Sequence, residues 1–241
     1  MSRSSQDIIE NIKGGLIVSC QVEKHAPGYR EDSVISLVEA SIWAGVVGLR
    51  INGVQNIKDV RKITDLPIIG LKKVFTNESE VFMTPTINDV IEVIESGADI
   101  IAIDGTDRLI NGKKANQIIS EIKAKFPNVL VLADVRDTED ALESIRLGAD
   151  MVAPTFYRFK KDAKSTDLPD WEMFSEMCKK CNGLGYVLME GKVWTVDDAI
   201  RSLYYGAHAV VVGSAITRPH IIAQRFIDHM DGFSKKRGLL Y

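Results

Sequence analysis

Short apolar runs alternate with longer amphipathic segments along nearly the whole chain. The apolar runs are predicted as strands at residues 15–20, 46–51, 67–73, 99–104, 129–134, 150–155, 185–190 and 208–213. Apolar residues occupy consecutive positions in these runs and do not alternate with polar ones. This pattern is typical of parallel strands that are covered on both faces.

The segments between the strands carry apolar residues at helical spacing. In the segment 32–43, one side of a helix would hold Val34, Leu37, Val38 and Ile42. The same periodicity predicts helices at residues 87–96, 115–126, 138–147, 171–181, 195–205 and 218–230. Strands and helices therefore alternate, which is the order expected for an α/β protein with a parallel sheet.

A glycine recurs before every second strand, at Gly45, Gly97, Gly148 and Gly206. The spacing of roughly fifty residues corresponds to two strand–helix units, and glycine is the usual residue just after the end of a helix. Eight such units predict a single-domain (β/α)8 TIM barrel over residues 1–241, with 1–13 as an N-terminal helix or extension. A doubly wound open sheet is the alternative, but it usually has a G-x-G-x-x-G motif after its first strand, and this chain has none there.

Composition and charge exclude several classes of protein. Lys and Arg number 30, Asp and Glu number 33, and the net charge of -3 provides no basic field for nucleic acid. No apolar run approaches the roughly 18 residues that suggest a membrane span, and the N-terminus lacks a secretory pattern. The sparse cysteines, Cys20, Cys178 and Cys181, suit a reducing compartment. We therefore expect a cytoplasmic protein without nucleic-acid or membrane partners.

The Cys178–Cys181 pair matches a CxxC motif, which can indicate redox chemistry or half of a zinc site. The chain has no second cysteine or histidine pair at ligand spacing, and the pair falls on a predicted helix. We interpret both cysteines as packing residues.

Polar side chains end almost every predicted strand. In chain order they are Gln21, Arg50, Lys73, Asp104, Asp134, Thr155 and Glu190, and the eighth strand leads into Gly213 and Ser214. The carboxyl ends of the strands of a (β/α)8 barrel meet at one face, and active sites lie there. Contact with solvent would explain one or two such residues better than it explains a nearly complete set. We therefore predict a functional site at this face.

The turns after strands seven and eight are candidates for a phosphate site. Gly191 and Lys192 follow strand seven, Gly213 and Ser214 follow strand eight, and Arg218 precedes a proline at the start of the last helix. Glycine-containing turns at these two places commonly hold a phosphate on backbone N–H groups, and an arginine can add a charged contact. An ordinary strand–helix turn is the alternative interpretation.

Lys73 and Glu190 together indicate proton transfer. A lysine and a carboxylate that face the same carbon can remove and return a proton next to a carbonyl, provided that the lysine is neutral part of the time. Arg50 could supply a neighbouring cation or stabilise an enediolate oxygen. Neighbouring residues of a strand face opposite ways, so only one of Lys72 and Lys73 points inward, and the spacing leaves both possible.

Asp104 and Asp134 could hold sugar hydroxyls or orient the lysine. With Glu190 they could also bind Mg²⁺. However, none of the four histidines ends a strand, which argues against a histidine-based divalent site. We predict no metal and no cofactor.

Seven segments carry a resemblance to a known family: GLIVSCQ, VGLRIN, LPIIGLKK, DIIAIDGT, LADV, EGKVWTVDDA and VVGSAITRP. Together they resemble the N-acylglucosamine-6-phosphate 2-epimerases, the N-acetylmannosamine-6-phosphate epimerases of sialic acid catabolism, over roughly residues 15 to 230. The resemblance implies a (β/α)8 barrel, a phosphorylated amino-sugar substrate, proton transfer at C2, no redox cofactor and a homodimer. Outer aromatic residues that could contribute to such a dimer are Trp171, Tyr204 and Tyr205.

The family's functional residues map onto the strand ends of this chain. The catalytic lysine and glutamate fall on Lys73 and Glu190, so the alignment selects Lys73 over Lys72. The family's substrate-binding residues correspond to Gln21, Arg50, Asp134 and Arg218.

The chain departs from the family pattern at three places. The family motif T-T-L-x-G-Y-T after strand six is replaced by PTFYRFK at residues 154–160, and the Arg-Asp-Tyr after strand three is replaced at residues 74–76. Leu188-Met189 stands where the family has Ile-Ala. These changes bear on the substrate more than on the reaction class, since Arg158 and Lys160 could contact a different sugar substituent.

Two other functions remain open at this point. One is a non-catalytic sugar-phosphate sensor. The other is a related barrel enzyme, such as an aldolase that uses the lysine as a Schiff base. The long connection 74–86, which holds a further apolar piece, predicts a small extra strand or a loop over the barrel mouth.

Overall fold

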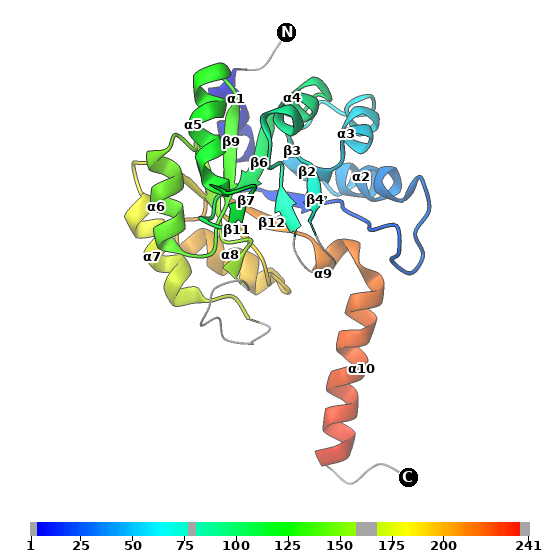
Figure 1. Cartoon of the computed structure of the whole chain (residues 1–241). Helices are drawn as coiled ribbons and strands as arrows, with labels where there is room; N and C mark the ends of the chain where they lie inside the picture. Colours follow the sequence, from blue (N-terminus) through cyan, green and yellow to red (C-terminus); the bar gives the residue numbers. More distant parts are fainter. Residues whose placement is uncertain (1–3, 77–80, 158–167, 237–241) are drawn as a thin grey trace.

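Eight parallel strands form a closed barrel in the computed structural model, which describes residues 4–76, 81–157 and 168–236 (Figure 1). Their bounds are β1 Leu16–Ser19, β2 Gly48–Asn52, β3 Ile68–Leu71, β6 Ile100–Asp104, β9 Leu130–Asp134, β10 Met151–Ala153, β11 Tyr186–Glu190 and β12 Ala209–Val212. The ring runs β1-β12-β11-β10-β9-β6-β3-β2. It closes where β1 pairs with β12 and with β2. The predicted (β/α)8 barrel is confirmed.

Helices surround the barrel and close the end at which its strands begin. The outer helices are α2 Ser33–Trp43, α3 Val54–Arg61, α4 Ile87–Glu95, α5 Ile118–Lys125, α6 Thr138–Arg146, α7 Trp171–Cys181 and α8 Val196–Tyr204, with the short η1 Ala115–Gln117 before α5. The N-terminal helix α1 Ser5–Ile12 buries Ile8, Ile9 and Ile12 in the interior of the barrel. Helix α3 was not predicted, because only Ile57 and Val60 of its eight residues are buried.

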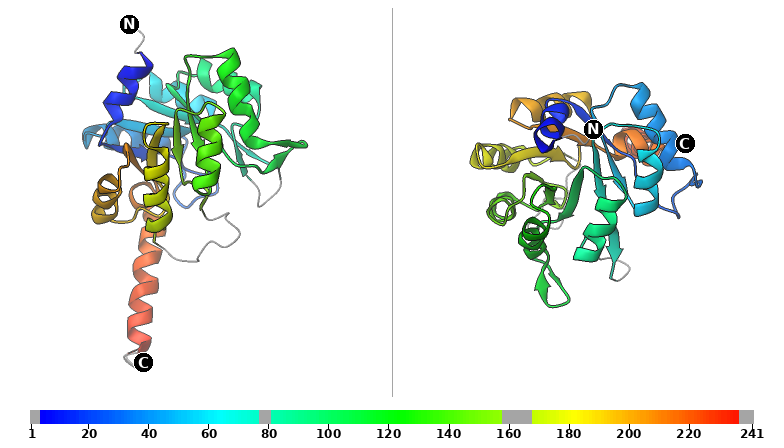
Figure 2. Two further views of the ribbon diagram at one scale, coloured as in Figure 1. Left: turned by 90° about the vertical axis from the view of Figure 1, so that its left-hand side faces the viewer. Right: turned by 90° about the horizontal axis from the view of Figure 1, so that it is seen from above.

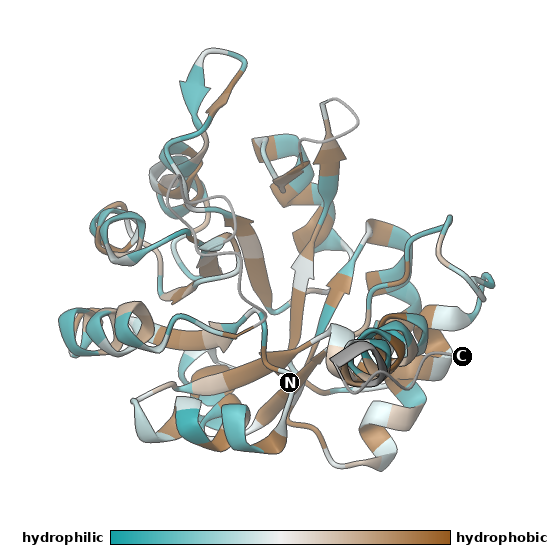
Figure 3. Cartoon of the chain, turned by 90° about the horizontal axis from the view of Figure 1, so that it is seen from below, coloured by the Kyte–Doolittle hydropathy of each residue, from teal (hydrophilic) through white to brown (hydrophobic). Residues whose placement is uncertain are grey.

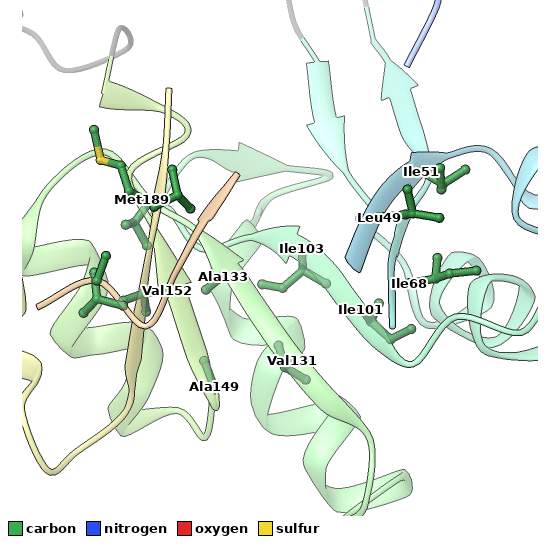
Figure 4. Close-up of a cluster of buried hydrophobic side chains, with 14 of the residues drawn as sticks. Leu49, Ile51, Ile68, Ile101, Ile103, Val131, Ala133, Ala149, Val152 and Met189 are labelled. Atoms are coloured by element: carbon green, nitrogen blue, oxygen red, sulfur yellow. The ribbon is translucent and has the colours of Figure 1, made fainter. Parts of the chain in front are cut away.

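The strands bury both of their faces, as their continuous apolar sequences predicted. In β6, Ile101 and Ile103 point outward into a layer between the strands and the helices, whereas Ile100 and Ala102 point into the barrel. Figure 4 shows part of the outer layer, with side chains from several strands packed together. Because residues alternate between the two layers, the second residue after such an inward-facing pair also points into the barrel.

The recurring glycines have the conformation that the repeat predicted. Gly45, Gly97, Gly148 and Gly206 each follow a helix and have φ values of 83°, 98°, 111° and 104°. After α8, the N–H of Ala207 donates to the carbonyl of Ser202, which is the closing hydrogen bond of this type of helix end. These turns send each helix back toward the amino end of the next strand.

The predicted strand 67–73 divides into two elements. β3 ends at Leu71, and Lys73 begins a second strand, β4 Lys73–Phe75, which pairs antiparallel with β5 Val81–Met83. The extra strand expected in the connection 74–86 is therefore present. A second small ribbon joins β7 Leu109–Ile110 to β8 Lys113–Lys114.

The C-terminal helix departs from the barrel pattern. After the short α9 Ser214–Thr217, α10 Pro219–Lys236 extends away from the barrel (Figures 1 and 2). Up to residue 233, none of its side chains is buried. Its exposed apolar residues include Phe226 at 68% and Met230 at 65%. Figure 3 shows brown segments on the projecting helix. None of the described helices has both the length and the apolar character that a membrane crossing requires.

The glycine at the end of α8 provides a test of these turns. Gly206→Ala places a Cβ on a left-handed backbone, where the nearest atom is Cys178 Cβ at 3.6 Å. We expect the free energy of unfolding to fall by about 1–2 kcal/mol from the backbone conformation alone, measured by urea denaturation. The matched control is Gly232→Ala within α10, where no atom lies within 4 Å. It should be neutral or stabilising by about 0.5–1 kcal/mol, and equal losses in both variants would contradict this account.

Candidate active site

The predicted strand-end residues continue the inward-facing side of their strands. In β3, Ile69 and Leu71 belong to the barrel interior, and Lys73 follows on the same side. Lys72 faces the other way, and its Nζ lies 2.7 Å from Asp89 Oδ1 on α4. The geometry therefore selects Lys73 as the inward lysine, in agreement with the alignment.

A cavity of about 420 Å³ opens at the carboxyl ends of the strands. Most of the predicted site residues line it: Gln21, Arg50, Lys73, Thr155, Glu190, Gly191, Lys192, Gly213, Ser214 and Arg218. Asp104 and Asp134 are not among its lining residues. The structure thus brings together the predicted catalytic pair and the two predicted phosphate turns around one space.

Arg50 occupies the floor of this cavity and is almost completely buried, at 1% exposure. Its guanidinium donates to both carboxylate oxygens of Asp134, at 3.0 and 2.6 Å, and also to Glu190. Thr155 Oγ1 donates to Asp134 at 2.6 Å. Asp134 therefore lies one layer below the cavity, where it holds Arg50 and Thr155 in place.

The charges in this cluster affect the protonation of Glu190. Burial and the neighbouring charge of Asp134 raise the pKa of Glu190 to about 7, although Arg50 opposes the shift. The physical reason is that Glu190 is buried and shares the single guanidinium of Arg50 with Asp134, so Arg50 compensates only part of the cost of ionising Glu190. A carboxyl with a pKa near 7 can both give and take a proton at neutral pH.

Lys73 is held from two directions. Its backbone N–H donates to Asn52 Oδ1 at 3.0 Å, and its Nζ donates to Glu23 Oε1 at 2.7 Å. Burial alone would raise the pKa of Glu23, but the hydrogen bond and charge of Lys73, with Arg218 and His25, lower it overall. Glu23 is therefore an anion in the resting structure.

The two predicted phosphate turns face the same side of the cavity. Gly191 has φ of 104° and Lys192 has φ of 56°, an unusual conformation for a residue with a side chain. Lys192 Nζ lies 5.3 Å from the ring centre of Tyr157. Gly213 precedes the short helix α9, whose first N–H groups have no partner within the helix. Both turns can therefore present N–H donors to an anion.

Asp104 has a different environment from the one we expected. It is buried, accepts hydrogen bonds from Thr106, and pairs with Arg108. The Arg108 guanidinium lies 4.5 Å from the ring centre of Phe82 and 4.9 Å from that of Phe156. Asp104 thus belongs to a packed cluster beside the cavity, and its predicted contact with substrate stays a prediction.

Sequence reasoning missed several residues of the site. Glu23 and Tyr157 each lie two residues beyond the strand-end positions that were considered, and Asp170 and Trp194 come from the loops before α7 and α8. Tyr157 OH donates to Asp170 Oδ2 at 3.0 Å. The buried Nε1 of Trp194 has no hydrogen-bond partner among the described residues. Arg158 and Lys160, expected near the sugar, lie outside the described residues.

The cysteines and the acidic residues do not form a metal site in the described part of the chain. No group of three or more metal-binding side chains occurs there. Cys178 and Cys181 are free and buried on α7. Burial raises the pKa of Cys178 to about 12 and that of Cys181 to about 11, which leaves both thiols protonated and favours a packing role.

Comparison with known proteins gives one consistent result. The family described as "Putative N-acetylmannosamine-6-phosphate epimerase" matches residues 34–232. A protein of Caldanaerobacter subterraneus subsp. tengcongensis, named "Putative N-acetylmannosamine-6-phosphate 2-epimerase", is 36% identical over 222 residues, 92% of this chain and 93% of the relative. A protein of the same name from Listeria welshimeri is 37% identical over 229 residues, 94% of this chain and 96% of the relative.

A solved structure supports the same comparison. The N-acetylmannosamine-6-phosphate 2-epimerase from Clostridium perfringens superposes with a TM-score of 0.85 at 31% identity. The match covers 95% of this chain and 98% of that chain. The resemblance indicated by the sequence motifs is therefore confirmed.

The raised pKa of Glu190 predicts a particular pH dependence of stability. The folded protein holds this proton up to about pH 7, whereas the ordinary value is 4.5. The stabilising effect of this protonation is therefore complete below about pH 4.5 and is lost as the pH rises through 7.

In Glu190→Gln, the free energy of unfolding, measured by urea denaturation from pH 5 to 8, should fall less steeply than in the wild type. Glu95→Gln, which changes an exposed glutamate on α4, should retain the wild-type slope. An unchanged slope in Glu190→Gln would exclude a raised pKa.

Proposed function

The chain belongs to the N-acetylmannosamine-6-phosphate epimerase family, and from this premise we propose that Lys73 and Glu190 carry out its epimerisation at C2. The enzyme is an isomerase that interconverts N-acetylmannosamine-6-phosphate and N-acetylglucosamine-6-phosphate. The observation that supports these roles most strongly is the shared cavity, which both side chains line together with the two phosphate turns. We place the reaction in sialic acid catabolism and in the cytoplasm, as the motif resemblance implies.

Lys73 acts as the base. The C2–H bond is acidic only when C1 is an aldehyde, so the reaction proceeds on the open-chain sugar. Lys73 Nζ takes the proton from C2, the bonding electrons form the C1–C2 double bond of an enolate whose negative charge lies on O1, and return of a proton to the opposite face of C2 gives the epimer. Arg50 on the cavity floor is placed to stabilise negative charge on the sugar oxygens.

Glu190 acts in ring opening and in polarising the carbonyl. Opening the hemiacetal requires removal of a proton from O1 and delivery of one to the ring oxygen. A carboxyl with a pKa of about 7 is suited to exchange both protons near neutral pH. The contact with Arg50 keeps Glu190 in one orientation while this exchange takes place.

The phosphate and the sugar occupy opposite parts of the cavity. Gly191, Lys192, Gly213, Ser214 and Arg218 hold the 6-phosphate through backbone N–H groups and one guanidinium. Gln21 and Thr155 contact the sugar from the ends of their strands, and both line the cavity.

The first experiment is proton NMR of N-acetylmannosamine-6-phosphate with the enzyme in D2O. Formation of N-acetylglucosamine-6-phosphate with deuterium at C2 supports the epimerase with proton transfer. Exchange without product would indicate that the altered loop after β10 has changed the substrate. Binding without any exchange would favour the sugar-phosphate sensor. Borohydride trapping of substrate on the lysine would favour an aldolase.

Neighbouring lysines allow a matched test of the base. Lys73→Gln should reduce C2 exchange at least 10³-fold, roughly the contribution of a general base, while binding of N-acetylglucosamine-6-phosphate changes little. Lys72→Gln removes the adjacent charge, which pairs with Asp89 and Glu92 outside the cavity. It should retain activity within about threefold, as a surface ion pair contributes little. Comparable loss in both variants would show that the lysine at 73 has no special role.

We further propose that the protein is a homodimer in which α10 is the main contact. In the described chain, α10 packs on α9 and leaves its apolar residues exposed. The barrel face between α8 and α2, where an eighth helix would pack, exposes Trp43 at 90% and Tyr204 at 87%. Each protomer thus has an exposed apolar helix and an exposed apolar surface on its barrel. In a two-fold symmetric dimer, the helix of each protomer would pack on that surface of the other. Trp171 and Tyr205 instead pack on each other, with ring centres 5.8 Å apart.

Charge on α10 tests the dimer. Light scattering of the wild type should give twice the chain mass of 26.7 kDa. The double variant Phe226→Asp and Met230→Asp should give the monomer mass, because carboxylates would replace the apolar contact. Gln224→Asp, at a polar position of the same helix, should remain dimeric. A wild-type monomer, or a dimer that survives the double substitution, would contradict this interface.

A further inference from the structure

The ion pair between Lys73 and Glu23 conflicts with the role of Lys73 as a base. Nζ donates to the Glu23 carboxylate at 2.7 Å, and a carboxylate at this distance stabilises an ammonium group. A base must instead present a free electron pair to C2–H. The two states exclude each other, so the pair has to break before proton transfer begins.

The Glu23 side chain is positioned so that it can move away from Lys73. It lies on the loop between β1 and α2, and its side chain is 30% exposed, compared with 13% for Lys73. Its carbonyl accepts from Ala26 N–H at 2.9 Å, which fixes the backbone turn and leaves the side chain to rotate. Unlike Lys73, Glu23 does not line the cavity. The Glu23 carboxylate therefore contacts the Lys73 amine from the edge of the cavity.

The charges around this pair are largely positive at the phosphate end. Arg218 and His25 both act electrostatically on the Glu23 carboxylate. Besides Arg218, the charged groups that share the cavity with Lys73 are Arg50, Asp170, Glu190 and Lys192. Arg50 and Glu190 are paired with each other on the floor. An anion that enters the cavity thus meets Arg218 and Lys73, of which Lys73 is paired with Glu23.

We propose that Glu23 is a resting-state counter-ion for Lys73 and Arg218, which the phosphorylated sugar displaces when it binds. The inference rests on the proposed function and adds a positioning residue to it. The dianionic phosphate pairs with Arg218, and the sugar occupies the position of the Glu23 carboxylate beside Lys73 Nζ. Glu23 then turns to solvent, and Lys73 loses the partner that stabilised its ammonium form. Substrate binding itself thereby prepares the base.

Displacement has a kinetic signature that a merely structural residue would not produce. The pH dependence of kcat/KM reports groups of the free enzyme, and that of kcat reports groups of the enzyme–substrate complex. Glu23 contacts Lys73 only in the free enzyme. Its removal should therefore change the first profile and leave the second unchanged.

The test compares Glu23→Gln with the wild type by C2 deuterium exchange from pH 5 to 9. In the variant, the rise of kcat/KM with pH should move about one unit toward lower pH, the lower end of the effect of a neighbouring charge. The kcat profile should not move, and KM at pH 7 should fall about three- to tenfold. Glu31→Gln, which removes an exposed carboxylate from the same loop, should leave both profiles unchanged.

Four results would overturn the proposal. Equal shifts of both profiles would mean that the pair persists in the complex. No shift of either pH profile would mean that Glu23 does not act on the base. A lower KM without a shift would mean that Glu23 only repels the phosphate. A large loss of kcat would make Glu23 a participant in catalysis.

Calorimetry with N-acetylglucosamine-6-phosphate separates this proposal from the proposed function. If the wild type shows no exchange at any pH, the epimerase assignment of the site fails. Binding still tests displacement, because Glu23→Gln should tighten it about three- to tenfold at pH 7. That gain should be smaller in the Lys73→Gln background, where the ion pair is already absent and only the charge of Arg218 still acts on Glu23. An undiminished gain there would refute displacement from Lys73.

Discussion

The burial of one guanidinium constrains the whole active end of this barrel. Arg50 can remain charged without water only because Asp134 holds it with two hydrogen bonds and Glu190 with a third contact. These residues belong to β2, β9 and β11, so the cluster links strands that are far apart around the ring. Burial of Glu190, together with the charge of Asp134, raises its pKa to about 7, because one guanidinium serves two carboxylates. Rigidity and acid–base chemistry thus have the same origin.

Much of the fold follows from the sequence because both faces of each strand are apolar. Such runs are conspicuous, and the glycines between units mark where the helices end. Because both faces are apolar, the sequence does not show which side chains of a strand point into the barrel. Spacing therefore could not decide which of Lys72 and Lys73 faces inward. Helix α3 escaped prediction because its sequence VQNIKDVR buries only two side chains. Tertiary packing on β2 and β3, more than local periodicity, accounts for that helix.

The site was predictable where it depends on strand ends and unpredictable where it depends on loops. Most strand-end residues line the cavity, since the alternation of each strand continues to its last residue. Asp104 follows the same alternation but is paired with Arg108, a contact across four residues that strand position alone does not reveal. Glu23 and Asp170 reach the site through turns. After β10, Phe156 packs beneath Arg108 and Tyr157 bonds to Asp170, so the residues that depart from the family pattern brace the cavity wall.

The closure of the ring has a consequence for how the chain is made. β1 pairs with β12, so that Leu16 lies opposite Val210, and the barrel cannot close before its last strand is available. At a synthesis rate of about 5–20 residues per second, β1 would leave the ribosome roughly ten seconds or more before its partner. During that interval one edge of β1 has no strand to pair with, and unpaired edges promote association between chains. In a nascent chain, the edge of β1 that later pairs with β12 is therefore open to pairing with another chain until the last strand has emerged.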